Sequence, residues 1–433
     1  MLRKRLAATV CLVASIAPAV PRANATDSAT SPRGTAEVSS VFVEMAPLVA
    51  RNRQGPTRTS RLYGIIGYAM LAASNVRPAF LDKVSEGVDL PTPSTTIDDA
   101  IAGVAAGTTT VRKLMPTQLD RSTYAELRDR LLSQLITSAP KGVDVRASIT
   151  RGISAAGAVL TRAKNDGFDA ATKTPYKPGE QPGAWVPTAP GFQAAIDPGW
   201  GTLRPYLAAT KECTLPKPPT SGPSNDPYHD AAGEVADVAK ALTDEQRSIA
   251  RFWDDGRGRS STPSGHWIEI ASRAAVANAI DVGATISTFG AMTMALADSV
   301  IANWREKYTW NVERPITVLS RTDSQWTSYL TTPAFPEYPS GHSTISRVAA
   351  EVLTASIGEW SFTDEGWGLT PASRKKFEIT PRSFDSFTAA ADEAGLSRLL
   401  GGIHYRFSID AGVDLGRCVV KPYAAVFLAP QGK

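Results

Sequence analysis

The last third of the chain carries seven groups whose chemistry suits the binding of one tetrahedral or trigonal-bipyramidal oxyanion. They are Lys307, Arg314 and Arg398 as cations, Ser340 and the Gly341 amide as neutral donors, and His342 and His404 as imidazoles. Guanidinium groups give such an anion forked, permanently charged contacts, and lysine adds a point charge. Two imidazoles allow one ring to bond the central atom while the other moves protons. We therefore expect an enzyme site built from these residues.

The stretch F-P-E-Y-P-S-G-H-S, residues 335–343, places three of these groups side by side. A run of small and apolar residues follows directly, from Thr344 to Ile357, and predicts a helix. A loop that enters a helix presents backbone N–H groups, and here also a hydroxyl and an imidazole, to one point in space. The stretch therefore indicates a binding site for phosphate or vanadate.

Two pairs of residues flank this stretch. Lys307 and Arg314 lie seven residues apart in K-Y-T-W-N-V-E-R-P, so a continuous helix would carry both side chains on nearly the same face. Pro315 then ends or redirects that helix. Arg398 near a helix end and His404 beyond a glycine pair are expected to point into the same cavity.

Helices must position these residues. With 433 residues, of which 42% are hydrophobic, the chain is long enough for a large buried core. Apolar residues recur at three- and four-residue spacing from Val41 to about Ala170, and helical signals resume at Asp230. The uncharged interval 282–297 is short for a membrane span and is bounded by aspartates, so it predicts a buried helix. We predict an all-α helical bundle.

The segment between the two helical regions is different. Thr174 to Pro223 is dense in proline and glycine, which marks a long irregular excursion, either a functional loop or a plain connection. We expect three parts: residues 1–25 as a signal peptide, 26–225 as an N-terminal helical half that includes this loop, and 226–433 as the catalytic bundle with the oxyanion site.

The first 25 residues have the composition of a secretory signal peptide. Leu2 to Arg5 form a basic start, Leu6 to Val20 a mostly apolar run, and Ala23 to Ala25 a small-residue cleavage site. A buried first helix is the alternative. The sequence thus predicts export to the periplasm or the extracellular space, and no transmembrane segment after cleavage.

Cleavage changes the charge and the cysteine count. It removes four of the 46 Lys and Arg residues and no acidic residue, which leaves 42 basic against 42 acidic residues. The mature chain is then neutral, which excludes nucleic acid as a default partner. Cys11 also leaves, and the remaining Cys213 and Cys418 either form one disulfide or stay reduced. Neither has the spaced Cys or His neighbours of a zinc site.

Three blocks occur in a fixed order: K-x6-R-P from Lys307, P-S-G-H from Pro339 and S-R-x5-H from Ser397. In this order they resemble the superfamily that unites vanadium-dependent haloperoxidases with type 2 phosphatidic acid phosphatases and bacterial non-specific acid phosphatases, and the haloperoxidase branch most. The resemblance covers about Asp255 to Asp410 closely and the N-terminal half only in helical character. It implies the helical-bundle fold of that superfamily.

The resemblance also implies a role for each residue of the site. The residues that would hold the equatorial oxygens are Lys307, Arg314, Ser340, Gly341 and Arg398. His404 would bond vanadium, or attack phosphorus in a phosphatase, and His342 would be the acid/base. Asp255 resembles the family carboxylate that pairs with Arg398, with Asp254 as the near alternative. A solvated loop acid is the other interpretation.

Three further positions bear on the reaction. Trp304 and Phe335 lie where similar fungal chloroperoxidases carry aromatic residues that line the halide pocket, although aromatic residues before a bundle helix also serve as plain core. Ser408 is a departure, because family members commonly place aspartate four residues after the second histidine, where it orients the imidazole. Ser408 can accept a hydrogen bond, and Asp410 lies two residues further on, but neither brings the same charge to the same place.

Short matches also occur outside this pattern. Pro263 to His266 repeats P-S-G-H, yet no K-x6-R-P precedes it, and relatives carry a Thr-Pro-Pro stretch in that region. We predict a loop-to-helix transition before Trp267 there, not a site. Arg204-Pro205 has Asp197, not lysine, seven residues earlier, and His229 has no motif around it and is expected at the surface.

Three functions fit the pattern. The leading prediction is an exported vanadate-dependent haloperoxidase that uses hydrogen peroxide to oxidise bromide or chloride to hypohalous acid, which halogenates small organic acceptors. The first alternative is a soluble acid phosphatase that hydrolyses phosphomonoesters through a phosphohistidine at His404, without vanadate. The second, motivated by Ser408, is a non-catalytic oxyanion-binding protein. The oligomeric state is left open.

Overall fold

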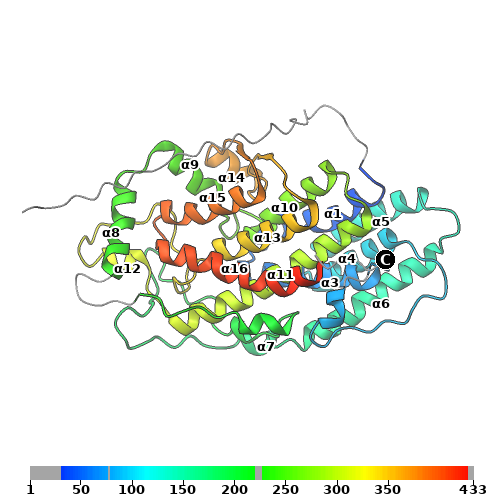
Figure 1. The fold of residues 1–433 in the computed structure, drawn as a ribbon, viewed down its shortest axis with the longest axis horizontal. Helices are drawn as coiled ribbons and strands as arrows, with labels where there is room; N and C mark the ends of the chain where they lie inside the picture. The colour runs from blue at the N-terminus through cyan, green and yellow to red at the C-terminus, as the bar shows by residue number, and fades with distance from the viewer. Residues whose placement is uncertain (1–30, 77–78, 220–226, 428–433) are drawn as a thin grey trace, which may run out of the picture. The chain divides into compact units, whose positions relative to one another are not determined.

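Helices form nearly all of the regular structure in the residues that the computed structural model describes, which are 31–76, 79–219 and 227–427. In chain order the α-helices are α1 Thr35–Val43, α2 Ala46–Arg51, α3 Pro56–Ala73, α4 Asp99–Leu114, α5 Gln118–Thr137, α6 Val145–Lys164, α7 Phe168–Ala171, α8 Pro227–Lys240, α9 Asp244–Phe252, α10 Thr262–Ala277, α11 Val282–Trp310, α12 Pro315–Leu319, α13 Gly341–Ile357, α14 Pro371–Lys376, α15 Phe387–Leu400 and α16 Arg406–Phe427. Short 3-10 helices, η1 Ala79–Lys83, η2 Trp200–Thr202 and η3 Ala208–Glu212, lie in the connections. The predicted all-α class is confirmed (Figure 1).

A small antiparallel ribbon accompanies the helices. Its strands are β1 Phe362–Asp364 and β2 Arg382–Phe384, with Phe362 opposite Phe384 and Asp364 opposite Arg382. The ribbon lies between α13 and α15 in the sequence. It brings the buried carboxylate of Asp364 to the end of a strand.

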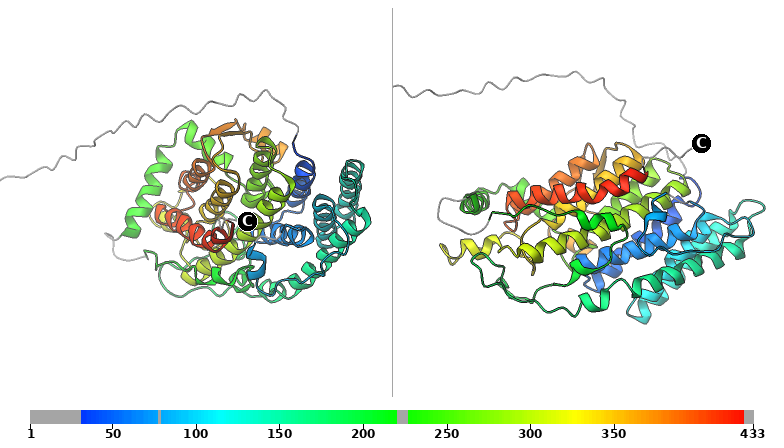
Figure 2. Two further views of the ribbon diagram at one scale, coloured as in Figure 1. Left: turned by 45° about the vertical axis from the view of Figure 1, so that its right-hand side comes forward. Right: turned by 60° about the horizontal axis from the view of Figure 1, so that its bottom comes forward.

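The long helix α11 is the centre of the bundle. Asp281 caps its first turn by accepting the N–H of Ala284 at 2.9 Å. α3 packs against one side of α11, and α13 and α16 pack against another (Figure 2). By length and composition α11 could cross a membrane, but nine-tenths of its apolar window is buried by the other helices. The uncharged interval 282–297 is thus the core helix that the sequence predicts.

The N-terminal helices begin at side-chain caps and pack closely. The capping residues are Asp98 for α4, Thr117 for α5 and Asp144 for α6. α4 packs against α3, α5 and α6. Gly152 of α6 permits the closest of these approaches, because a Cβ at this position would lie 2.4 Å from the Ala102 carbonyl oxygen of α4. These helices support α11 from the side of α3.

The C-terminal helices α13, α15 and α16 pack against one another, and α13 and α16 cover another side of α11 (Figure 2). A disulfide joins Cys213, which follows η3, to Cys418 of α16, with a Cα–Cα distance of 5.7 Å. The pairing that the sequence left open is therefore formed. It links the end of the proline-rich excursion to the helix that follows His404.

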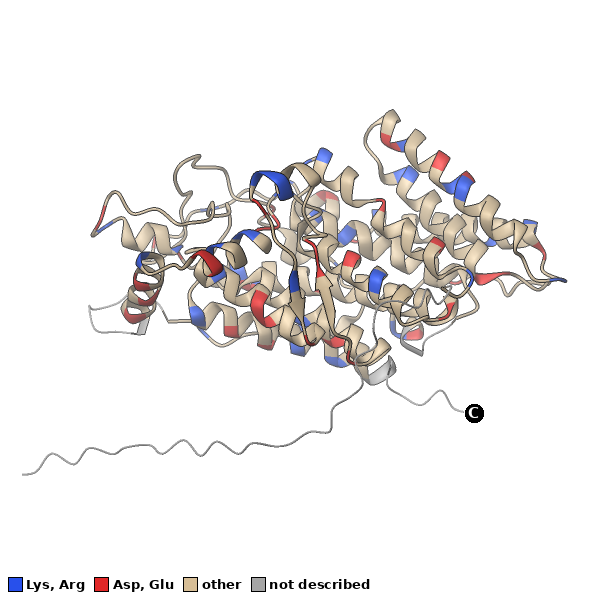
Figure 3. Ribbon diagram, turned by 90° about the horizontal axis from the view of Figure 1, so that it is seen from above, with Lys and Arg blue, Asp and Glu red and all other residues tan. Residues whose placement is uncertain are grey.

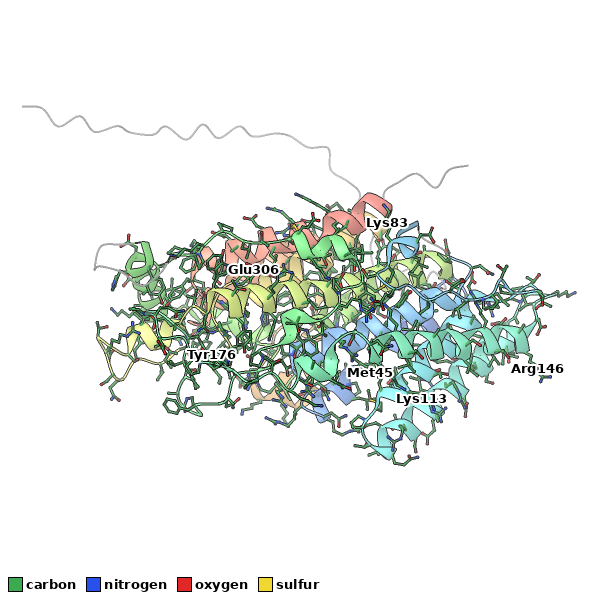
Figure 4. The ribbon with its side chains drawn as sticks, turned by 90° about the horizontal axis from the view of Figure 1, so that it is seen from below. Met45, Lys83, Lys113, Arg146, Tyr176 and Glu306 are labelled. Atoms are coloured by element: carbon green, nitrogen blue, oxygen red, sulfur yellow. A yellow bond between two sulfur atoms is a disulfide. The ribbon has the colours of Figure 1, made fainter. Side chains whose placement is uncertain are left out.

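The proline- and glycine-rich excursion is ordered against the end of α11. We call residues 176–196 the strap. Tyr176, labelled in Figure 4, donates its hydroxyl to the Asn311 side chain at 3.0 Å, and the Trp185 N–H donates to the Asn311 carbonyl at 2.7 Å. Further along, the Ile196 N–H donates to the carbonyl of Ala334 at 2.9 Å. The strap is therefore attached at both ends to residues next to the predicted site.

The helices of both halves belong to one compact unit, which begins at Ser31. The predicted boundary between 225 and 226 falls in the range 220–226, which lies outside the described residues, as does the predicted signal peptide of residues 1–25. Acidic and basic residues are interspersed along the helices (Figure 3), as the balanced composition leads one to expect.

Candidate active site

Lys307 and Arg314 come from two segments rather than from one helix face. α11 ends at Trp310, where Asn311 adopts a left-handed conformation (φ 50°, ψ 42°) and donates its N–H to the Lys307 carbonyl. Arg314 directly precedes Pro315, the first residue of α12. The interpretation of a shared helix face is therefore wrong, because the helix stops before Arg314. Pro315 does redirect the chain, by starting the next helix.

The ammonium group of Lys307 is fully buried and is held by backbone carbonyls. Its Nζ donates to the carbonyl oxygens of Pro336, Glu337 and Pro339 at 2.9, 2.9 and 2.6 Å. Burial lowers the pKa of Lys307 well below its ordinary value, and the charge of Arg314 lowers it further, while Glu337 opposes both. Lys307 thus ties the last turn of α11 to the segment that leads into α13. The expected contact of Lys307 with an equatorial oxygen is not borne out, because all three N–H groups of its ammonium donate to these carbonyls.

The guanidinium of Arg314 is also fully buried and is only partly satisfied by the protein. Its Nε donates to the Phe335 carbonyl at 3.0 Å, and Nη1 donates to the Ile403 carbonyl at 2.7 Å and lies 3.1 Å from His404 Nε2. Nη2 is buried without a hydrogen-bond partner among the described residues. Burial lowers the pKa of Arg314 to about 10. A buried guanidinium nitrogen without an acceptor is suited to an anion.

Hydrogen bonds fix the tautomer of His404. Because Arg314 Nη1 can only donate, His404 Nε2 must accept and therefore carries no proton. Nδ1 carries the proton and donates it to Glu337 Oε1 at 2.7 Å, and the same oxygen accepts the Tyr405 N–H at 3.0 Å. The single Nε2 lone pair of His404 is thus directed toward Arg314 Nη1, and this hydrogen bond must open before Nε2 bonds an electrophilic centre.

Glu337 supplies the carboxylate that the sequence seemed to lack at Ser408. The Ser408 hydroxyl lies 3.4 Å from His404 Nδ1, whereas Glu337 Oε1 lies at 2.7 Å. Asp410 is exposed and has no part in this contact. Sequence reasoning missed Glu337, although it lies inside the stretch 335–343. The signal was a single acid in an otherwise uncharged segment between two cationic blocks.

The charges around His404 keep its ring neutral. Burial lowers the pKa of His404 well below the ordinary value, and the charges of Arg314 and Lys307 lower it further. Burial raises the pKa of Glu337 to about 7, while Arg314 and Lys307 act in the opposite direction. A neutral ring with Nδ1 protonated is the form in which histidine bonds a metal or attacks phosphorus.

Ser340 and Gly341 lie at the N-terminus of α13, as predicted. Ser340 is the N-cap, and its hydroxyl accepts from the Ser343 N–H at 3.3 Å and from the Ser343 hydroxyl at 2.9 Å. The Ser340 N–H is used by the Ser408 carbonyl at 2.9 Å. Beside Gly341 there is open space, since the only atom within 4 Å of a Cβ built there would be the Asn303 Oδ1. Gly341 and His342 hold the first two positions of a 17-residue helix, whose first amides have no partner within the helix and suit an anion.

His342 presents one unsatisfied ring nitrogen. The ring hydrogen-bonds to the backbone of Trp253, and Nε2 is shielded from solvent with no partner in the described parts of the chain. Burial lowers the pKa of His342 well below its ordinary value, and the charge of Arg398 lowers it further. A neutral imidazole with an unpaired nitrogen is suited to accept a proton, in line with the predicted acid/base role.

Arg398 lies near the end of α15 and is buried. Its Nε donates to the Ser397 hydroxyl at 2.9 Å, and its Nη2 donates to the carbonyl of Trp253. Burial lowers the pKa of Arg398 to about 10, against the opposing charges of Asp254 and Asp255. The Trp253 backbone is therefore shared by Arg398 and His342.

Asp255 is buried but does not bond to Arg398. Its two carboxylate oxygens lie 3.2 and 3.1 Å from His266 Nδ1, and Asp254 pairs instead with Arg259 at 2.6 Å. Within the described residues no ion pair joins Arg398 to either aspartate. The predicted Asp255–Arg398 pair is therefore wrong, because the buried imidazole takes up the carboxylate. The alternative of a solvated loop acid is wrong as well, since Asp255 is buried.

Trp304 and Phe335 form an aromatic wall beside the cations. Their ring centroids lie 4.9 Å apart, and the Phe335 ring centroid lies 5.1 Å from Lys307 Nζ and 5.0 Å from Arg314 Cζ. Trp304 Nε1 donates to the carbonyl of Ile196 at the end of the strap. The wall is thus held by the proline-rich excursion and borders the predicted anion site.

The donor set fits vanadate or another tetrahedral oxyanion. Arg314 Nη2 and His342 Nε2 are buried and unpartnered among the described residues, the unprotonated His404 Nε2 lies 3.1 Å from Arg314 Nη1, and no atom crowds the Cβ direction of Gly341 within 3.7 Å. Gly341 and His342 belong to α13, Arg314 directly precedes α12, and His404 lies just before α16. The structure therefore joins the three sequence blocks around one place.

The second P-S-G-H does what the sequence predicts for it. It starts α10, which runs from Thr262 to Ala277, and none of the oxyanion-site hydrogen bonds described above involves its side chains. His229 is exposed, as expected. His266 is nevertheless fully buried, because it lies between Asp255 and Asp364.

Known proteins with similar sequences are vanadium-dependent enzymes, in agreement with an oxyanion site in this chain. The family described as VCPO second helical-bundle domain matches residues 287–428, which carry all three blocks. Vanadium chloroperoxidase of Curvularia inaequalis is 24% identical over 463 aligned residues, which span 83% of this chain and 76% of that protein.

Solved structures give the same picture. A bacterial vanadium-dependent iodoperoxidase superposes with a TM-score of 0.75 at 30% identity, over 90% of this chain and 96% of the other. A bacterial vanadium-dependent chloroperoxidase in its holo form shares the fold, with a TM-score of 0.66 at 18% identity over 88% and 94% of the two chains. On these similarities the chain belongs to the vanadium-dependent haloperoxidase family.

Proposed function

We propose that this chain is an exported enzyme that requires vanadate and uses hydrogen peroxide to oxidise halide to hypohalous acid, which halogenates small organic acceptors. The observation that carries the proposal is the orientation of His404, whose Nε2 is left as an acceptor beside buried cations by Glu337 and Arg314. Family membership supports the same reaction class. The proposal of export rests on the composition of residues 1–25.

The cations and the start of α13 would hold the oxyanion. His404 Nε2 would bond the vanadium, and the unpartnered Nη2 of Arg314 would contact an oxygen, as would Arg398. Ser340 and the Gly341 amide would add neutral donors at the helix N-terminus. When bound, vanadate supplies a Lewis acid that activates peroxide without a change in oxidation state.

His342 would move the protons of the reaction. Overall, hydrogen peroxide, one halide ion and one proton give hypohalous acid and water. His342 Nε2 can take the proton that hydrogen peroxide loses on binding and later return it to a departing oxygen. Lys307 would act on the anion by its charge and not by a hydrogen bond, because its three N–H groups donate to backbone carbonyls.

Trp304 and Phe335 would border the path of the halide. Their rings lower the local dielectric and exclude water next to Lys307 and Arg314, which strengthens electrostatic interactions there. Bromide and chloride are the predicted substrates. Iodide joins them as a candidate because the 30% identical relative is named an iodoperoxidase.

The test is an assay of the purified protein loaded with orthovanadate. Halogenation of a phenolic dye is followed with hydrogen peroxide and, in turn, chloride, bromide and iodide across mildly acidic to neutral pH. We expect turnover that depends on vanadate and is lost in His404→Ala. Absence of vanadate-dependent turnover with all three halides would overturn the proposal.

Phosphomonoester hydrolysis is a second candidate, because the same geometry presents His404 Nε2 as a nucleophile toward phosphorus. His342 would then protonate the leaving alcohol. A burst of aryl phenolate from an aryl phosphate, abolished in His404→Ala, would select this reaction over halide oxidation.

A non-catalytic oxyanion-binding protein was the third interpretation, and its motive was Ser408. Since Glu337 brings a carboxylate to His404 Nδ1, that motive is removed. Tight vanadate binding by calorimetry, with turnover of neither halide nor phosphoester, is the result that would restore it.

A further inference from the structure

The buried cluster around His266 is not part of the chemistry described above. His266 is fully buried, with Nδ1 3.1 Å from Asp255 Oδ2 and Nε2 2.7 Å from Asp364 Oδ2. A neutral imidazole has a single N–H and would turn a lone pair toward one of these carboxylates. Only the doubly protonated ring donates to both. Burial opposes this charge, but the two aspartates raise the pKa of His266 to about 10.

His266 joins three segments that are distant in the sequence. Asp255 lies in the turn after α9 and has a positive φ of 42°. His266 itself lies in the second turn of α10, and Asp364 ends β1. The other oxygen of Asp364 accepts the N–H groups of Gly366 and Trp367 at 2.7 and 2.9 Å, which fixes the carboxylate in the loop that follows.

The ring of His266 is tightly enclosed. The Trp253 ring stacks on it with centroids 4.6 Å apart and an interplanar angle of 29°. On another side, a Cβ built on Gly368 would lie 2.3 Å from the imidazole Cγ, so only glycine fits there. The imidazole can therefore shift little without moving Trp253 or the loop after β1.

Trp253 links this cluster to the oxyanion site. Its carbonyl accepts a hydrogen bond from Arg398 Nη2, and its backbone also hydrogen-bonds to the ring of His342. The position of one peptide group thus sets the direction of a cation and of the proton-moving imidazole. The turn that carries this group is held on one side by Asp255, which His266 clamps.

The cluster also keeps the Asp255 carboxylate from bonding to Arg398. A carboxylate bonded directly to Arg398 would compete with an anion for its N–H groups. His266 instead takes the hydrogen-bonding role toward Asp255, and no ion pair with Arg398 forms in the described residues. The Arg398 guanidinium is therefore oriented by Trp253 and keeps N–H groups for an anion.

We propose that His266 is a positioning residue for the oxyanion site: by clamping Asp255 and Asp364 it fixes the Trp253 peptide that orients Arg398 and His342. The inference rests on the proposed function only in that this site binds an oxyanion. It assigns a role to the second P-S-G-H, whose histidine acts at a distance on the first.

The experiment compares orthovanadate dissociation constants of the full-length protein and its variants by titration calorimetry, without peroxide or halide. His266→Gln should weaken vanadate binding by about 10- to 100-fold, the range that follows loss of a partner that orients a ligand group. Inorganic phosphate serves as a second probe and should follow the same trend. Asp364→Asn, which removes the charge facing His266 Nε2, should weaken binding in the same direction and by less.

Asp298→Asn is the matched control for loss of a buried carboxylate. Asp298 is fully buried on α11 and accepts from Tyr206, Leu207 and Tyr423, all outside the site. It should lower the melting temperature and leave the vanadate dissociation constant unchanged. If His266→Gln and Asp364→Asn also lower only the melting temperature, the proposal is overturned. If His266→Gln does not fold, Asp364→Asn beside Asp298→Asn decides the question.

A double-mutant cycle separates positioning from general loosening. If His266 acts through Trp253 on Arg398, the loss of vanadate affinity in His266→Gln/Arg398→Lys should be smaller than the sum of the single losses. Full additivity would contradict the proposal. Failure of the wild-type protein to oxidise halide, with these binding differences intact, would overturn the proposed function alone.

Discussion

The chain contains P-S-G-H twice, and the two copies start different helices in different registers. At Pro339, Ser340 is the N-cap of α13, so Gly341 and His342 occupy its first two positions. At Pro263, the N-cap is Ser261, so Ser264 to His266 already lie inside α10. The amides of the first copy are therefore among those a helix leaves unpaired, whereas Gly265 and His266 fall within the hydrogen-bonded helix.

The surroundings of the two copies also differ: the first has open space and an unpartnered nitrogen, and the second is crowded and fully hydrogen-bonded. The space beside Gly341 is open, but a Cβ on Gly265 would lie 2.4 Å from Ser261. Nε2 of His342 has no partner in the described residues, and burial lowers the pKa of that ring. His266 has a carboxylate at each nitrogen, and its pKa is raised to about 10. One histidine is kept neutral and available, while the other is charged and fully bonded.

The chemical environment of a short motif thus depends on helix register and neighbouring charge. Four identical residues are suited to bind an anion where they straddle the start of a helix among cations. The same residues become an internal clamp where they lie one turn further in among acids. Replacing the residues that differ in charge or contact between the two copies of P-S-G-H tests this difference.

His342→Ala is expected to have the largest effect on turnover. Loss of a positioned general acid/base lowers kcat by about 10²- to 10⁴-fold, with a smaller change in vanadate binding. Steady-state halide oxidation at saturating vanadate measures this. His266→Gln should show the reverse, with binding affected more than kcat at saturation. If kcat and the vanadate dissociation constant change in the same proportion in both variants, the two histidines do not have separate roles.

Glu337→Gln is expected to have the second largest effect. Glu337 lies three residues before Ser340, and the second P-S-G-H has Ser261, which carries no charge, at the corresponding position. Without the carboxylate at His404 Nδ1, vanadate affinity should fall by about 10- to 100-fold. Ser408→Ala is the matched control and should have little effect, since its hydroxyl lies 3.4 Å from the same nitrogen.

Rescue makes the Glu337 prediction stricter. Ser408→Asp in the Glu337→Gln background returns a carboxylate four residues after His404 and should recover part of the lost affinity. Equal vanadate affinities in Glu337→Gln and the wild type, measured by calorimetry, would show that another group orients His404.

The charge of His266 should appear in the pH dependence of stability. A folded-state pKa of about 10 lies above the value of about 6.5 for an unfolded histidine. The stabilisation is therefore complete below about pH 6.5 and is lost as the pH rises toward 10, by up to about 1.4 kcal/mol per pH unit. The groups that face this ring are Asp255 and Asp364, and the charge of His266 also acts on Glu269 and His342.

Urea unfolding at pH 6 and pH 9 measures this effect. The wild-type advantage over His266→Gln in the free energy of unfolding should be larger at pH 6. A difference that is independent of pH would mean that His266 is neutral in the folded protein, contrary to the hydrogen bonds at both ring nitrogens.

Phe335→Leu is expected to have a smaller effect than the replacements of His342, Glu337 and His266. It removes a ring that lies 5.1 and 5.0 Å from two buried cations, a contact worth about 0.5–2 kcal/mol. We expect a several-fold rise in KM for halide with little change in vanadate binding. Trp304→Phe keeps an aromatic ring but loses the hydrogen bond to Ile196 and should have a smaller effect on halide KM. A larger rise in halide KM in Trp304→Phe than in Phe335→Leu would mean that the halide lies nearer the strap.

Much of the fold is predictable from the sequence, because helix starts and apolar spacing are local signals. The run from Thr344 to Ile357 predicts α13, and the uncharged interval 282–297 predicts the buried centre of α11. The extension of α11 to Trp310 escapes prediction, because its end depends on the left-handed conformation of Asn311. The ribbon of β1 and β2 escapes as well, since its three-residue strands carry too short a pattern.

The site is predictable in its cations and imidazoles but not in its acids. Lys307, Arg314 and His404 are found by their spacing, and the structure places them together. The partners of carboxylates depend on tertiary packing, which spacing does not report. For this reason the sequence pairs Asp255 with Arg398, whereas the structure pairs it with His266, and the spacing gives no sign of the Glu337 contact with His404.

We infer that an oxyanion binds at His404 and that His342 and His266 have separate tasks. The most direct measurement is a crystal structure after soaking with orthovanadate, with vanadium located by its anomalous scattering. We expect one peak bonded to His404 Nε2, with the Glu337 carboxylate at Nδ1 and with Arg314 and Arg398 on the oxygens. His266 should be unchanged between Asp255 and Asp364. Absence of a peak at His404, or a peak beside His266, would contradict this inference.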